Sequence, residues 1–149
     1  MALKTMIANI AKARDNYEKA KAALGEDAQK AVAAEIAEVL PKGMRLQWTQ
    51  YTPYFNDGDA CTFGVRSAYV LPVAADEDVD EYEYGIEIDG YVIKRYENTI
   101  GGLQKDDLIR IEEVWRQLPE DLLESAFGDH VQVVVMPDGA WKVDKHRHD

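Results

Sequence analysis

The first forty residues place apolar side chains at the spacing of an α-helix. Seven apolar positions fall at alternating steps of three and four, which puts them on one helix face: Leu3, Met6, Ile10, Ala13, Tyr17, Ala20 and Leu24. Gly25 is suited to end this helix, Asp27 to cap a second one, and Pro41 to stop that second helix. The pattern predicts an αα-hairpin over residues 1–41, although the same heptad spacing also suits pairing between two subunits.

After Gly43 the apolar period changes from that of a helix to two, which is typical of a half-buried strand. Met44, Leu46 and Trp48 alternate with polar residues, and after a polar turn the alternation resumes at Cys61, Phe63 and Val65. Residues 43–149 are therefore expected to form a sheet, with helices at about residues 104–127, where leucine, isoleucine and tryptophan return to helical spacing.

Two Asp-Gly dipeptides favour tight turns between strands. Asp89-Gly90 follows the alternating run that ends at Ile88, and Asp138-Gly139 follows three alternating valines that end at Val135. Each dipeptide predicts a β-hairpin. The expected fold is α+β in one domain, residues 1–149: an N-terminal αα-hairpin, an antiparallel sheet built from hairpins, and a helix pair inserted before the C-terminal hairpin.

The net charge of the chain restricts the classes of partner that it is expected to bind. The chain has 149 residues, 28 acidic and 17 basic, and a formal net charge of −11. Such a negative field repels nucleic-acid phosphates and anionic membrane surfaces, so we expect neither as a direct partner. A single cysteine leaves no internal disulfide framework, and no long apolar run is present, so a cytoplasmic protein is expected.

Acidic residues concentrate between Asp76 and Asp89, where no lysine or arginine occurs. The alternation before Asp89-Gly90 puts four of these carboxylates on one polar strand face: Glu81, Glu83, Glu87 and Asp89. A charge run of this kind is commonly a solvated surface. The alternative is a surface that imitates nucleic-acid phosphates and takes part in binding.

An aromatic cluster beside a flexible acidic turn gives the second candidate surface. Tyr51, Tyr54 and Phe55 cannot all share the face of Trp48 on an extended strand, so at least one should be exposed or tucked into the loop. The loop adds Asn56, Asp57 and Asp59, whose oxygens suit hard cations, but their spacing differs from the calcium-binding loop and favours a hydrogen-bonded turn.

Residues that can carry chemistry are few. Cys61 alternates with apolar neighbours and is interpreted as a buried structural thiol. His146 and His148 can point the same way on a strand and form a weak metal candidate. The alternative to a binding function is a small metal-assisted hydrolase that uses Asp57, Asp59, His130 and His148. Common enzyme and phosphate-binding motifs are absent from the sequence, and no cofactor is expected.

The run WTQYTPYFNDGDACTF, residues 48–63, resembles a block found in a family of small phage and bacterial proteins, as do residues 127–131 and the closing His148-Asp149. That family has no assigned activity. The resemblance implies a phage-type accessory protein, expected in the host cell cytoplasm if phage-encoded, and carries no mechanism with it.

Together these observations predict a non-enzymatic, acidic, phage-type protein that acts by binding another protein. One form of this hypothesis is an inhibitor that occupies the nucleic-acid-binding surface of a host enzyme or defence factor. The protein itself is expected to be a monomer, or a homodimer that pairs through the first helix.

Overall fold

The computed structural model describes residues 2–54, 58 and 61–146 and has an α+β fold, as predicted. The helices are α1 (Leu3–Val39), α2 (Glu81–Tyr84), α3 (Gly90–Lys94), α4 (Lys105–Arg116) and α5 (Glu120–Phe127). The strands are β1 (Met44–Tyr51), β2 (Gly64–Val65), β3 (Tyr69–Pro72), β4 (Ile86–Glu87), β5 (Val131–Val135) and β6 (Trp141–Lys145). None of the helices in the described residues is long and apolar enough to cross a membrane.

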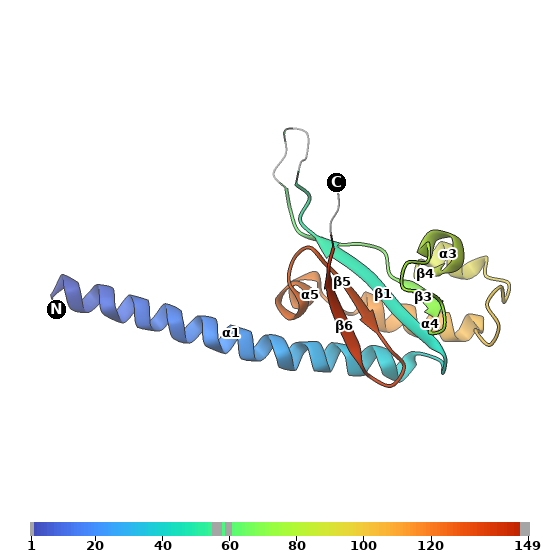
Figure 1. Ribbon diagram of the computed structural model, residues 1–149, viewed down its shortest axis with the longest axis horizontal. Coiled ribbons are helices and arrows are strands. Elements are labelled where there is room, and N and C mark those ends of the chain that lie inside the picture. Colours follow the sequence, from blue (N-terminus) through green and yellow to red (C-terminus); the bar gives the residue numbers. More distant parts are fainter. Residues whose placement is uncertain (1, 55–57, 59–60, 147–149) are drawn as a thin grey trace.

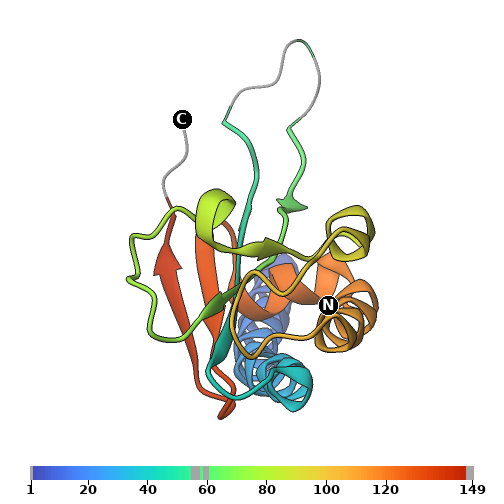
Figure 2. The ribbon, with the colours of Figure 1, turned by 90° about the vertical axis from the view of Figure 1, so that its right-hand side faces the viewer.

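Strand β1 is the centre of an antiparallel sheet with the order β4-β3-β1-β5-β6, and β2 pairs with the end of β1. Its apolar positions stand opposite apolar partners, with Leu46 between Val70 of β3 and Val135 of β5. Helices α1, α4 and α5 lie on one face of the sheet, and the segment that leads into α2 crosses the other (Figures 1 and 2). Both faces of β1 are therefore covered.

Alternate residues of β1 point into the helical layer, as their period of two predicts. Leu46 and Trp48 are completely buried, and the Trp48 ring contacts Trp115 of α4 and Phe127 of α5 at centroid distances of 4.8 and 5.6 Å. Gln50 follows on the same face, where its side chain accepts from Trp48 Nε1 and donates to the carbonyls of Leu123 and Gly128. This set joins β1 to α4 and α5.

The predicted N-terminal αα-hairpin is wrong, because α1 is one continuous helix of 37 residues that passes through Gly25 (Figure 1). A glycine inside a helix costs only about 1 kcal/mol, and no proline interrupts the run. Gly25 lies where α1 meets α5, and a Cβ there would stand 3.3 Å from the Ser125 carbonyl oxygen. It serves a close helix contact rather than a turn.

The hairpin predicted at Asp89-Gly90 is also wrong. The Asp89 carboxylate accepts from Tyr91 N at 2.7 Å and caps α3, while β4 pairs back with β3. Ile93 and Tyr96 are buried and stand three residues apart, the spacing of a helix, whereas Tyr91 is exposed. An aspartate before glycine suits a helix cap as well as a turn, and burial of Ile93 and Tyr96 selects the cap.

The helix pair and the C-terminal hairpin follow the prediction. Helices α4 and α5 form the expected pair, and α5 ends at Gly128, whose φ of 91° lies in the left-handed region. Strands β5 and β6 form the C-terminal hairpin, in which Val133 faces Val143 and Gly139 takes a positive φ in the turn. The strand expected at residues 61–65 shortens to β2, Gly64–Val65.

Gln50→Leu should destabilise the fold by about 3 kcal/mol, since it removes the hydrogen bonds of Gln50 with Trp48 Nε1 and with the carbonyls of Leu123 and Gly128, each contributing roughly 1 kcal/mol. Urea denaturation followed by tryptophan fluorescence measures the change. Gln117→Leu, at an exposed position, is the matched control and should change stability by less than about 0.5 kcal/mol. Equal effects of the two substitutions would contradict this role of Gln50.

Candidate interaction surface

A buried arginine of the sheet binds the chain at the start of the acidic segment, residues 76–89. Arg45 of β1 is only 4% exposed, on the face opposite the helices. Its guanidinium donates to Gln47 Oε1 and to the carbonyls of four residues of the crossing segment, at 2.7–3.3 Å: Pro72, Val73, Ala75 and Asp76. Burial lowers the pKa of Arg45, and the Glu77 carboxylate opposes that shift. The arginine keeps its charge at neutral pH and orders the start of the acidic segment.

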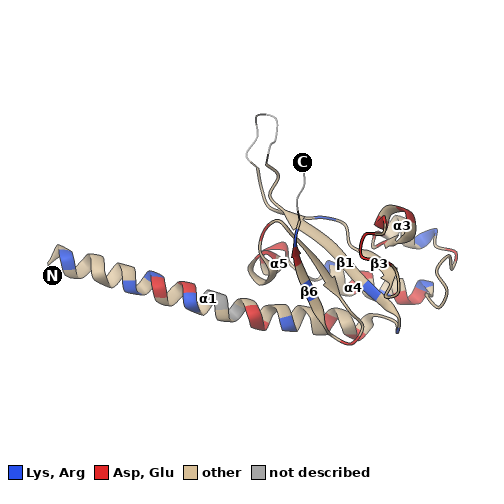
Figure 3. Cartoon of the chain, in the orientation of Figure 1, with Lys and Arg blue, Asp and Glu red and all other residues tan. Residues whose placement is uncertain are grey.

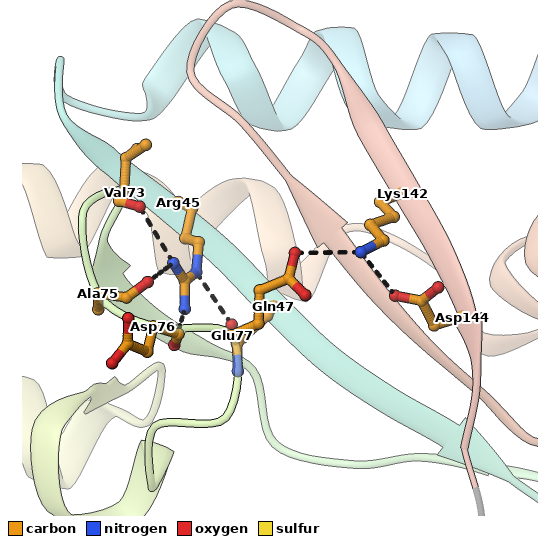
Figure 4. Close-up of polar contacts among 8 residues, drawn as sticks. All are labelled: Arg45, Gln47, Val73, Ala75, Asp76, Glu77, Lys142 and Asp144. Atoms are coloured by element: carbon orange, nitrogen blue, oxygen red, sulfur yellow. Dashed lines mark hydrogen bonds and ion pairs between the residues drawn. The ribbon is translucent and has the colours of Figure 1, made fainter.

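Two further contacts position that segment, and Figure 4 shows the one made by Lys142. Gln47 donates to Glu81 Oε2 at 2.8 Å, and Lys142 of β6 pairs with Glu77 at 3.1 Å and with Asp144 at 3.4 Å. The hydrogen bond that Lys142 donates to Glu77 and the charge of Asp144 raise the pKa of Lys142. Arg45, Gln47 and Lys142 also line a cavity of about 240 Å³ under the segment. Their donors are already engaged with protein groups, so the cluster acts as a clamp.

Beyond this clamp the chain presents a surface rich in tyrosine and carboxylate, residues 81–91, which we name the acidic edge. It comprises α2, the edge strand β4 and the start of α3, and it contains no lysine or arginine. Tyr82, Tyr84 and Tyr91 are 81%, 56% and 75% exposed. The Tyr82 ring still contacts buried Tyr69 edge-on, with centroids 5.4 Å apart. Figure 3 shows acidic residues gathered at this end of the molecule.

The four acidic candidates from the sequence all belong to the acidic edge, but not as one strand face. Glu81 and Glu83 lie on the helical turn α2, Glu87 lies on β4, and Asp89 caps α3. The predicted strand face is wrong because Asp80 caps α2 by accepting from Tyr82 N, which turns this part of the chain into a helix. Glu83 and Asp89 are exposed, whereas Glu81 and Glu87 are half-buried.

The aromatic candidates lie at the opposite end of β1. The Tyr54 ring stacks on His130 with centroids 4.8 Å apart, and the Tyr51 ring lies 5.8 Å from that of His146. Arg66 covers Tyr51 at 4.3 Å from the ring centroid. The pairs form because the last residues of β1 and β6 lie beside the first residues of β5. His146 N also donates to the His130 carbonyl.

Asp129 connects the segment after β1 to the start of β5 at this end of the sheet. Its carboxylate accepts from Thr52 N and Thr52 Oγ1, both at 2.7 Å, and from His130 N at 2.9 Å. Burial acts to raise the pKa of Asp129, but the hydrogen bonds from Thr52 and His130 outweigh it and hold the pKa below its ordinary value of 3.8. His130 follows with a φ of 56°, which a residue other than glycine rarely adopts.

Several sequence candidates fall outside the described residues: Phe55, Asn56, Asp57, Asp59 and His148. Among the residues that are described, no three histidine, cysteine, aspartate or glutamate side chains are placed to hold a metal ion. Cys61 is half-buried rather than buried.

Sequence reasoning missed the clamp residues Arg45 and Lys142, as well as Asp129. Arg45 alternates with the apolar residues Met44, Leu46 and Trp48, and a solvent-facing position is the ordinary interpretation of such a polar residue. Its burial depends on the segment from residue 72 to 76, which folds over that face. The periodicity of the strand does not indicate that another segment lies over its polar face.

Comparison with protein-family models, with curated proteins and with solved structures finds no significant match to this chain. The function therefore has to be argued from the surface itself.

Arg45→Met should loosen the acidic segment, since the substitution removes every hydrogen bond from the guanidinium to the carbonyls at 72–76. Hydrogen exchange at the amides of Ala75 and Val79 should accelerate at least about tenfold, as expected for loss of more than about 1.4 kcal/mol of local stability. Arg95→Met, at an exposed position, is the control. Unchanged exchange in Arg45→Met would show that the segment is held by other contacts.

Asp129→Asn should lower stability at neutral pH and change it much less in acid. A carboxylate whose folded pKa is depressed adds stability above its ordinary pKa of 3.8 and loses that contribution as the pH falls through the lower folded value. The melting temperatures of wild type and variant should therefore converge below pH 3.8. Thermal denaturation between pH 7 and pH 2.5 measures this, and a gap that does not depend on pH would refute it.

Proposed function

We propose that this protein acts by binding a basic partner protein through the acidic edge, residues 81–91. The observation that carries the proposal is the exposure of three tyrosines, Tyr82, Tyr84 and Tyr91, in a segment whose charged residues are all acidic up to Tyr91. Tyrosine is enriched at interface centres because it brings a large contact area at a low entropic cost. Lysine and arginine of a partner complement both the carboxylates and the tyrosine rings.

The clamp beneath the acidic edge favours a binding role over a merely solvated charge run. Arg45 orders the chain before α2, Gln47 bonds Glu81, and Asp80 and Asp89 cap the two short helices. An ordered surface loses less conformational entropy when a partner binds than a flexible loop does. These contacts hold the tyrosines and carboxylates in place before any partner arrives.

The chemistry of the acidic edge suits a partner that otherwise binds nucleic acid. Carboxylates on a rigid surface present negative charge to lysine and arginine as phosphates do, and the formal charge of −11 steers the protein toward such a surface. With the phage-type origin that the resemblance of residues 48–63 implies, this describes a non-enzymatic accessory protein that inhibits a nucleic-acid-binding host enzyme or defence factor.

The test is displacement from DNA. Proteins of a bacterial lysate are bound to DNA-cellulose, the wild-type protein is added, and the released protein is identified and purified for affinity measurements at low and high salt. Glu83→Gln with Glu87→Gln should weaken binding by about twofold to thirtyfold, since each of the two surface ion pairs contributes roughly 0.2–1 kcal/mol. Tyr82→Ala with Tyr91→Ala should weaken it about tenfold or more.

The matched control, Glu113→Gln with Glu124→Gln, removes the same charge from exposed positions of α4 and α5. Its affinity should stay within about twofold of wild type, because only the overall field changes. Glu81 and Asp89 are left intact because they bond Gln47 and cap α3. Release of no protein, or equal loss of affinity in the two charge variants, would count against the acidic edge.

A further inference from the structure

The N-terminal part of α1 projects beyond the rest of the molecule and carries an apolar stripe that no described residue of the chain covers (Figure 1). We name residues 3–20 the arm. Six residues of the stripe keep the alternating spacing of three and four, and all are exposed: Leu3, Met6, Ile10, Ala13, Tyr17 and Ala20. Leu3, Ile10 and Tyr17 are 71%, 58% and 62% exposed. Helices in water derive most of their stability from covering such a stripe, so this arrangement requires a partner surface.

We propose that the arm pairs in antiparallel orientation with the arm of a second copy of this chain. The spacing of three and four is that of a two-stranded coiled coil. At 1.5 Å per residue the arm is about 27 Å long, and burying about half its circumference removes on the order of 500 Å² per copy, or about 1,000 Å² in total. That total lies at the low end of specific interfaces, which predicts a reversible, concentration-dependent dimer.

Side-chain size favours the antiparallel orientation. In one antiparallel register Leu3 faces Ala20 of the second copy, and Ile10 faces its Ala13. Each of these layers joins a large side chain to a small one, so the helices keep an even separation. Met6 then faces Tyr17, where the flexible thioether can adapt to the ring. A parallel pair would instead stack Ile10 on Ile10 and Ala13 on Ala13, leaving voids between bulky layers.

Charge favours the same orientation. The arm holds four of the 17 basic residues and two of the 28 acidic ones, so the rest of the chain, with 13 basic and 26 acidic residues, carries a formal charge of −13. A parallel pair places two such bodies side by side. The antiparallel pair puts them at opposite ends of the arms, about 27 Å apart, which exceeds three Debye lengths of about 8 Å at physiological salt. The same negative body is repelled from anionic lipid, although the arm alone has the pattern of a membrane-surface helix.

Sedimentation equilibrium over a wide concentration range tests the pairing. The wild type should dimerise, and Ile10→Glu with Tyr17→Glu should raise the dissociation constant at least about tenfold, because each charge would be buried in the interface. The control is Ala8→Glu, which adds one charge on the opposite side of the arm and should dimerise like wild type within about twofold. All three positions are exposed, so the fold of each variant should stay intact, as circular dichroism can verify.

Disulfide cross-linking in a Cys61→Ser background tests the orientation. In the proposed dimer Leu3 lies next to Ala20 of the second copy, whereas the two Leu3 positions are about 26 Å apart, too far for a disulfide. Chains with Leu3→Cys should therefore cross-link only when mixed with chains carrying Ala20→Cys. Cross-linking of Leu3→Cys chains with each other would overturn the antiparallel arrangement.

A monomeric wild type at all concentrations would overturn the proposal. Sedimentation of such a monomer with vesicles of phosphatidylglycerol and phosphatidylcholine would assign the stripe to a lipid surface instead. Neither result bears on the acidic edge, whose residues 81–91 lie outside the arm.

Discussion

Strand β1 has to be covered on both faces, and the polar residues that alternate along it decide how this is done. Toward the helices, Gln50 satisfies Trp48 Nε1 and two carbonyls inside the core. Toward the other face, Arg45 satisfies the carbonyls of the segment that crosses it. A buried guanidinium or amide is tolerated only when its hydrogen bonds are made, so burial of these groups fixes the course of the chain on both sides. The helical layer and the acidic edge are both attached to the same strand.

This arrangement separates the molecule into surfaces with different chemistry. The acidic edge combines exposed tyrosines with carboxylates and rests on the clamp made by Arg45, Gln47 and Lys142. At the far end of β1, Asp129 joins the loop after β1 to the start of β5 and supports the ring pairs of Tyr51 and Tyr54 with histidines. The arm is apolar along one stripe and carries more basic than acidic residues. The proposed pairing of two arms would leave the acidic edge open to the proposed basic partner.

Much of the fold could be predicted because an element that is buried on one face carries apolar residues at a regular spacing. The alternation at Leu46 and Trp48, the helical spacing in α4 and α5, and the valines of β5 all describe elements whose apolar side meets the core. The wrong predictions concern residue types that are common in two different local structures. Gly25 can end a helix or permit a close helix contact, and Asp89 can begin a hairpin turn or cap a helix. In each case tertiary contacts decide which structure forms. Gly25 lies beside the Ser125 carbonyl and permits a close helix contact, and the burial of Ile93 and Tyr96 after Asp89 favours the helix.

The sequence by itself determined the α+β class, the strand that begins at Met44, the C-terminal hairpin and the concentration of negative charge between Asp76 and Asp89, because periodicity and composition are local properties. Only the tertiary structure decided that the first two predicted helices are one, that the acidic residues lie on short helices and an edge strand, and that Arg45 is buried. The stripe from Leu3 to Ala20 has the same pattern whether a helix packs within its own chain or extends away from it. Which of the two occurs depends on where the rest of the chain lies, since burial is a property of the folded surface rather than of the residue.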